Sequence, residues 1–203
     1  MGKVINKILF NFHRIKTLVL YRLLLSRIGF RSVIMSPILI SNGHCIKIGD
    51  KVLIRHGARL EVVLDGVNKS PELSIGDNTN IEQNVHIVCH SRINIGSNVS
   101  ITANCAIVDV EHPYENVEVG EKIGSKINID SSFVNIGDNC FLGIGVVVLP
   151  NVNIGEYCIV GAGSVVTKSL PPYSVAVGRP ARVIRRYNFS KKIWESLGSS
   201  DDF

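Results

Sequence analysis

The sequence predicts a mainly β protein built as a parallel β-helix, and a six-residue repeat is the main observation behind this prediction. From Ile136 the chain divides into the words IGDNCF, LGIGVV, VLPNVN, IGEYCI, VGAGSV and VTKSLP, each opened by an aliphatic residue. Such a short period indicates units that bury their apolar faces only by stacking on the next coil. A helix would instead repeat at three and four residues, and a two-sided strand would alternate at two.

The first 36 residues are predicted to be a basic amphipathic helical segment. Residues 1–50 carry eight Lys or Arg and a single acidic residue, Asp50, whereas the rest of the chain sums to −2. Cations interrupt the aliphatic stretch Val4–Ile28 too often for a membrane span. Two roles stay open for this segment: a cap on the open end of the solenoid, which we favour, or peripheral contact with a membrane surface. The cations lie in an aliphatic segment without a reader motif, so no nucleic acid partner is expected.

The repeat itself predicts a β-helix domain over residues 37–187. Aliphatic residues open further words at Ile48, Ile75 and Ile95. The longest break in the period predicts an inserted loop at about 109–128, and insertions in a solenoid often form its binding face. The remaining residues, 188–203, are read as a C-terminal tail.

Length and composition suit one packed domain, because 203 residues with 45% hydrophobic and 19% charged content are typical of a globular chain. Five cysteines and no recognisable signal peptide favour a reducing, cytoplasmic protein. Cys105, Cys140 and Cys158 occupy the fifth, inward position of a word, so packing explains them. Cys45 and Cys89 fall outside that register.

Residues 141–187, above all GAGSVVTK and GRPARVIR, resemble the hexapeptide-repeat acyltransferases, the family of galactoside, maltose and polysaccharide acetyltransferases. The resemblance implies a left-handed β-helix, a homotrimer, and acetyl-CoA in the groove between neighbours as the acyl donor. Glycines let the coenzyme approach the backbone, and cations attract its phosphates. By position, the family's coenzyme contacts correspond to Gly143, Ile144, Ala162, Thr167, Lys168, Arg182 and Arg185.

The resemblance also implies a catalytic base, His112, in the inserted loop. A hydroxyl that attacks a thioester must lose its proton, and neutral imidazole accepts protons near pH 7. Asp109 or Glu111 is expected to orient the ring. Asn84 corresponds by position to the family asparagine that contacts the acceptor, with Glu82 beside it. Cys89 stands where many sugar acetyltransferases place an acceptor-binding Asp, which indicates a changed acceptor pocket.

The predicted function is an acetyl-CoA-dependent O-acetyltransferase that acts on a sugar hydroxyl during synthesis of a bacterial surface polysaccharide such as O-antigen, capsule or exopolysaccharide. An amino-sugar N-acetyltransferase and a non-catalytic trimeric scaffold remain alternatives. His86 and His90 raise a zinc enzyme as a rival, but zinc needs at least three protein ligands, so no metal is expected.

Overall fold

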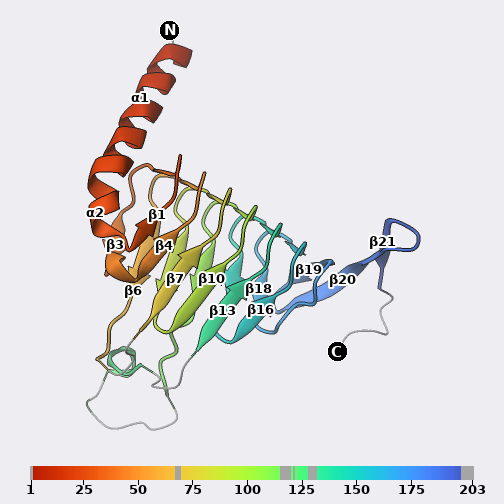
Figure 1. The fold of residues 1–203 in the computed structure, drawn as a ribbon. Helices are drawn as coiled ribbons and strands as arrows, with labels where there is room; N and C mark the ends of the chain where they lie inside the picture. Colours follow the sequence, from red (N-terminus) through yellow and green to blue (C-terminus); the bar gives the residue numbers. More distant parts are fainter. Residues whose placement is uncertain (1, 67–69, 115–119, 121, 128–131, 198–203) are drawn as a thin grey trace.

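The computed structural model places three parallel sheets around one core, as a left-handed β-helix, and so confirms the predicted fold class (Figure 1). It describes residues 2–66, 70–114, 120, 122–127 and 132–197. Each coil contributes one strand to each of three sheets, which we call A, B and C. A strand pairs with the equivalent strand one coil later, commonly 20 residues on, as Arg92 pairs with Glu72.

The strands of each sheet are short and lie in coil order. Sheet A contains β1 (Arg27–Ile28), β4 (Ile46–Ile48), β7 (Glu72–Ile75), β10 (Arg92–Ile95), β13 (Phe133–Ile136) and β16 (Val152–Ile154). Sheet B contains β2 (Val33–Ile34), β5 (Leu53–Ile54), β8 (Asn80–Ile81), β11 (Ser100–Ile101), β14 (Phe141–Leu142), β17 (Ile159–Val160), β19 (Ser174–Gly178), β20 (Ala181–Asn188) and β21 (Ile193–Ser196). Sheet C contains β3 (Leu39–Ser41), β6 (Arg59–Val62), β9 (His86–Cys89), β12 (Ala106–Val108), β15 (Val147–Val148) and β18 (Val165–Val166).

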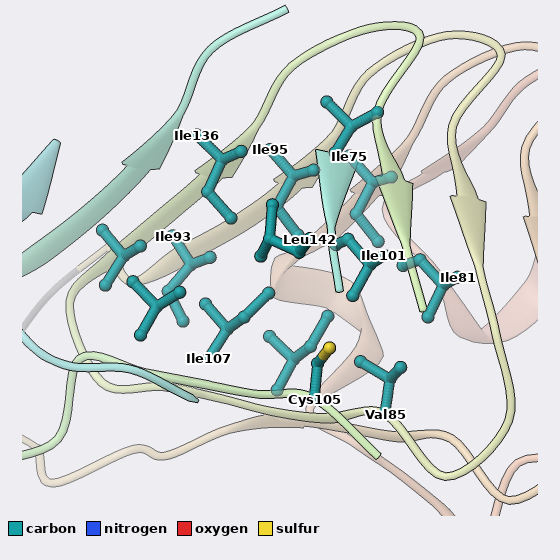
Figure 2. Packing of buried hydrophobic residues seen from close by; sticks show 14 of the residues in the cluster. Ile75, Ile81, Val85, Ile93, Ile95, Ile101, Cys105, Ile107, Ile136 and Leu142 are labelled. Carbon is teal, nitrogen blue, oxygen red and sulfur yellow. The ribbon is translucent and has the colours of Figure 1, made fainter. Parts of the chain in front are cut away.

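The aliphatic residues that open the words form the core, as the repeat predicts. Figure 2 shows side chains from all three sheets converging, among them Ile95 from sheet A, Leu142 from sheet B and Ile107 from sheet C. All three are at most 1% exposed. Cys105, Cys140 and Cys158 are buried among them, so their predicted packing role is confirmed. Because every coil shares this interior, the coils stabilise one another by stacking.

The repeated IGDN-like segments form the corner between sheets A and B, and the geometry of this corner explains their residue types. A Cβ on Gly76 would lie 2.6 Å from the carbonyl carbon of Gly96, so the coils approach too closely for a side chain. The next residue accepts a backbone N–H from the preceding coil, as Asp77 does from Asp50 at 2.7 Å. Asn78 follows in the left-handed region, with φ of 55°. The motif therefore turns the corner and links adjacent coils.

The helical N-terminal segment is shorter than the expected 1–36. It consists of α1 (Gly2–Lys16), the π-helical turn η1 (Thr17–Tyr21) and α2 (Arg22–Leu24). The first coil then begins at Arg27, which pairs with Lys47. Two-residue strands carry too little periodicity to separate them from the aliphatic helix before them. None of the helices in the described part of the chain has the length and apolar character needed to cross a membrane.

The solenoid ends in a short antiparallel extension of sheet B. Strand β19 pairs with β17 in parallel and with β20 in antiparallel, and β21 pairs with the end of β20. The tail expected from residue 188 onward therefore contains a strand. Aromatic rings cover this end, with Tyr157 stacked on Tyr173 at 4.9 Å between ring centroids.

Two insertions leave the solenoid where sheet C turns into the next sheet A strand. One separates β6 from β7, and the longer one separates β12 from β13 between Val108 and Phe133. A short 3₁₀ turn, η3 (Ile123–Ser125), lies in the longer insertion. A second such turn, η2 (Gly43–Cys45), lies at the corresponding corner of the first coil, between β3 and β4. In Figure 1 both insertions extend from one side of the solenoid. The longer insertion coincides with the stretch where the break in the period predicts a loop, and residues 115–119, 121 and 128–131 of this stretch lie outside the described ranges.

Candidate active site

The predicted site residues divide between two edges of sheet C. We call the turns from sheet B to sheet C (residues 35–38, 55–58, 82–85, 102–105, 143–146 and 161–164) the BC edge, and the turns from sheet C to the next sheet A strand the CA edge. The two edges lie on opposite sides of the sheet C strands. Which edge a residue occupies decides which residues can act together within one chain.

Three predicted coenzyme contacts, Gly143, Ile144 and Ala162, lie together on the BC edge. A Cβ on Gly143 would stand 2.6 Å from the Ala162 nitrogen, so only glycine fits there. The Gly143 N–H donates to the Val160 carbonyl at 2.8 Å and is therefore already used. No hydrogen bond to another described residue engages the N–H groups of Ile144 and Ala162. These two donors, one coil apart on an exposed edge, are available to a ligand.

The predicted phosphate-binding cations are exposed and come from both edges. Arg182, at the start of β20, pairs with Val177 near the BC edge, and Arg185 pairs with Val175 further along. Thr167 and Lys168 follow β18 on the CA side. The sequence reasoning missed Arg179, which donates from Nε to the carbonyl oxygen of Gly163. Its guanidinium fixes the outermost BC turn, a role that sequence position alone does not reveal.

His112 lies exposed in the long insertion, on the CA side. Its Nδ1 is 2.7 Å from the carbonyl oxygen of Lys126. A carbonyl oxygen only accepts hydrogen bonds, so Nδ1 must carry the proton and donate. In the neutral ring, Nε2 then keeps its lone pair and can accept a proton. The structure thus supplies an oriented base.

Asp109, one of the two residues expected to orient His112, is engaged elsewhere. Asp109 is fully buried, and its carboxylate accepts the backbone N–H groups of His90, Ser91 and Arg92, the last two at 2.9 and 2.7 Å. Burial raises the pKa of Asp109, although these hydrogen bonds act in the opposite direction. Asp109 therefore closes the base of the insertion, and the Lys126 carbonyl holds the imidazole. A backbone partner fourteen residues away leaves no mark in the sequence.

Asn84 and Glu82 lie on the BC edge, in the third coil. Asn84 is exposed, adopts φ of 57°, and donates from its side chain to Asn104 at 3.3 Å. The corresponding turns hold Gly57, Gly145 and Gly163, so this position requires a left-handed residue. Glu82 accepts from Arg55 at 2.9 Å. Both therefore have structural partners in addition to their predicted role.

Cys89 does not line a pocket. It points into the core at 0% exposure, and burial together with the Asp109 carboxylate raises the pKa of its thiol. Cys89 is therefore part of the core and cannot contact an acceptor directly.

The two histidines of the zinc alternative have separate surroundings. His86 lies half-buried on β9, where burial and the nearby Arg59 lower its pKa. His90 is 2% exposed, and its Nε2 lies 2.7 Å from Asp65 in the shorter insertion. Within the described ranges, no group of three or more His, Cys, Asp or Glu side chains is placed to hold a metal ion.

Two adjoining polar hollows at the foot of the long insertion escaped the sequence reasoning. They measure about 350 and 420 Å³ and share Arg92 and Asn135 on the outer face of sheet A. Only the alternation of strand residues could have indicated which side chains face outward there.

Comparison with known proteins gives the family. Residues 133–168 match the bacterial transferase hexapeptide family (six repeats). A protein of Escherichia coli (strain K12) that carries the name lipopolysaccharide biosynthesis O-acetyl transferase WbbJ is 32% identical over 181 residues, which cover 85% of this chain and 88% of that protein. The galactoside O-acetyltransferase of the same strain is 38% identical over 116 residues, 57% of this chain and 55% of the relative.

Among solved structures, AntD, an N-acyltransferase from Bacillus cereus in complex with dTDP and 3-hydroxybutyryl-CoA, superposes with a TM-score of 0.69. It is 21% identical, and the match covers 85% of this chain and 88% of AntD, so it supports the fold alone. The match to WbbJ extends over most of both chains. The chain is therefore an enzyme that belongs to the hexapeptide-repeat acyltransferases.

Proposed function

We propose that this protein is an acetyl-CoA-dependent O-acetyltransferase that acts on a sugar hydroxyl in the synthesis of a bacterial surface polysaccharide. The observation that carries the proposal is the order of the site residues along the solenoid. Asn84 and Glu82 belong to the third coil, His112 leaves between the fourth and fifth, and Ile144 and Ala162 turn the fifth and sixth. The base therefore lies at a level between the acceptor residues and the coenzyme residues, as direct transfer requires.

A homotrimer would bring these residues together. The outer face of the sheet C strands is mainly apolar from the third coil onward, with His86 as a polar exception. Val88, Val108, Val147, Leu149 and Val165 are all partly exposed there. Sheet A presents polar residues such as Lys47, Asn94 and Asn153 instead. If the sheet C faces meet around a threefold axis, the CA edge of each protomer abuts the BC edge of the next. His112 of one protomer then faces Ile144 and Ala162 of its partner.

The chemistry follows from this arrangement. The acceptor oxygen attacks the thioester carbonyl carbon while its proton passes to His112 Nε2. The N–H of Ile144 is the candidate donor to the oxyanion, in place of the occupied N–H of Gly143. The C–S bond then breaks, and the protonated imidazole returns its proton to the departing thiolate. Lys168, Arg182 and Arg185 hold the phosphates of the coenzyme.

The substrate class rests on the relatives. WbbJ is named for lipopolysaccharide biosynthesis and an O-acetyl transfer, and it matches this chain over most of its length. AntD is an N-acyltransferase, and an amine acceptor would use the same base and the same edge, so N-acylation is the second candidate. The available N–H groups and the oriented His112 weigh against a non-catalytic scaffold. Activated sugars are made in the cytoplasm, where we place the enzyme.

Mass spectrometry tests the reaction. Purified protein is incubated with acetyl-CoA and a panel of nucleotide sugars, oligosaccharides and lipid-linked sugars, and each acceptor is examined for one added acetyl group. Alkaline hydroxylamine treatment then distinguishes an ester from an amide, because only the ester is cleaved readily. A stable amide product would replace the proposal with N-acylation, and no product in any arm would remove it.

Mixed trimers test the shared site. His112→Ala removes the base, and Ala162→Phe fills the partner edge at an exposed position. If the site lies between protomers, mixing the two inactive variants restores up to about a quarter of the sites, because each site draws its residues from two chains. A site within one chain would give no recovery. The matched control mixes the double variant His112→Ala, Ala162→Phe with His112→Ala. No chain in this mixture carries His112, so no activity should return.

A further inference from the structure

Helix α1 and the π-helical turn η1 that continues it expose a continuous apolar stripe that the solenoid does not cover. Val4, Ile8, Phe12, Ile15 and Val19 follow one another at helical spacing, and each is 61–64% exposed. Ile5 and Leu9, beside the stripe, are 50% and 53% exposed. Leu23 extends the apolar surface at 83%. An uncovered apolar surface of this length on a folded chain indicates a docking face.

The helix meets the solenoid through its other side. Thr17 Oγ1 accepts the Ile34 N–H at 2.9 Å and donates to the His13 carbonyl at 2.7 Å. The rings of His13 and His56 lie 5.3 Å apart. Tyr21 and Leu25, just beyond, join the core. The cap expected at the solenoid end is therefore made by residues 17–25, while α1 extends away from the coils (Figure 1).

The charged residues beside the stripe indicate which kind of surface it would contact. No acidic residue occurs before Asp50, so nothing within the segment neutralises its cations. At about 100° per residue, Lys3, Lys7 and Arg14 gather on one side of α1, adjacent to the stripe. All three are exposed. A helix with an apolar stripe flanked by cations matches the boundary between acyl chains and anionic headgroups.

We propose that α1 docks on an anionic lipid surface, with its apolar stripe among the acyl chains and Lys3, Lys7 and Arg14 against the headgroups. Thr17 and Tyr21 then couple the helix rigidly to the first coil, so the solenoid stays at the membrane surface. This inference goes beyond acyl transfer, since it concerns where the enzyme sits. A second copy of α1 is a poorer occupant, because bringing two helices together opposes their cations.

Vesicle sedimentation tests the proposal with the full chain. Wild-type protein is mixed with vesicles of phosphatidylcholine alone or with phosphatidylglycerol added, which gives the vesicle surface a negative potential. We expect binding to the anionic vesicles that weakens with salt. Ile8→Asn with Phe12→Asn should lower the partition coefficient at least about tenfold, since both side chains leave the acyl region.

The matched control is Ile38→Asn with Phe30→Asn, which makes the same chemical change at residues that are 74% and 67% exposed outside α1. It should bind as the wild type does. Lys3→Gln, Lys7→Gln and Arg14→Gln together should weaken anionic binding by roughly a hundredfold, at about fivefold per cation.

Absence of wild-type binding to anionic vesicles would overturn the proposal, and so would equal binding by the stripe variant and its control. Light scattering without lipid provides a further check. If wild-type protein forms a larger assembly that the Ile8→Asn, Phe12→Asn variant lacks, the stripe contacts another copy instead. None of these readouts requires catalysis, so their failure is distinct from failure of the proposed reaction.

Discussion

The Nδ1 of His112 lies 2.7 Å from the carbonyl oxygen of Lys126, so the two limbs of the long insertion hold the imidazole between them. Both residues belong to the same insertion, and the ring therefore depends on the fold of the loop rather than on a carboxylate of the solenoid. The Lys126 carbonyl accepts from Nδ1 and leaves Nε2 as the ring nitrogen that faces a substrate.

His112→Ala should lower kcat by about 10² to 10⁴, the range for loss of a general base, with acetyl-CoA affinity nearly unchanged. Steady-state kinetics and calorimetry with acetyl-CoA give the two values. His44→Ala is the matched control, because His44 is another exposed histidine at a turn from sheet C to sheet A. Turnover that survives in His112→Ala would assign the base elsewhere.

Replacing Lys168 and Arg182 together by Ala should raise the KM for acetyl-CoA by at least about tenfold, with a smaller change in kcat. Each loses a hydrogen bond to a charged group, and phosphates distant from the thioester contribute mainly uniform binding. Arg186→Ala with Lys191→Ala removes the same charge from exposed positions outside the predicted set. Equal KM values in the two double variants would place the coenzyme phosphates on another surface.

The proposed acceptor role of Asn84 can be separated from its role in the turn. Asn84→Gly keeps the left-handed backbone and removes only the side chain, and Asn104→Gly does the same one coil later. We expect a higher acceptor KM in Asn84→Gly alone, with an unchanged coenzyme KM in both. Thermal melts should show similar stability for the two variants. A matching rise in acceptor KM in Asn104→Gly would mean that the side-chain pair acts only by supporting the edge.

Much of the fold could be predicted because one rule repeats. Every coil must bury an aliphatic residue at each of its faces, so the positions of Ile48, Ile95 and Leu142 in the core follow from the period. The end of the helical segment could not be placed, because the first coil has two-residue strands such as Arg27–Ile28. Their pairing partners lie 20 residues later and decide the boundary.

The site was harder to predict because its geometry depends on long-range backbone contacts. The hydrogen bond from His112 to Lys126, the burial of Asp109 and the inward direction of Cys89 all depend on how the insertion closes. Sequence position predicts which residues resemble family contacts. It does not separate an exposed carboxylate from one that accepts three backbone N–H groups.

Asp109→Asn should lower the free energy of unfolding by about 1–3 kcal/mol at pH 7, because the amide nitrogen replaces an oxygen that accepts the N–H groups of Ser91 and Arg92. Urea unfolding followed by circular dichroism measures the change. Asp77→Asn is the control, since its exposed side chain can keep Oδ1 as acceptor for Asp50, and it should stay within about 0.5 kcal/mol of the wild type.

The pH dependence of this difference gives a sharper check on Asp109. Burial raises its pKa in the folded protein, so the folded chain binds this proton more tightly than the unfolded chain does. The difference in free energy of unfolding between wild type and Asp109→Asn should therefore be largest below about pH 4, where an ordinary aspartate becomes protonated. This difference should decrease as the pH rises through the raised pKa of Asp109. An advantage that instead grows with pH would mean that the three N–H donors outweigh burial, and that Asp109 is held as a stabilised carboxylate at the base of the insertion.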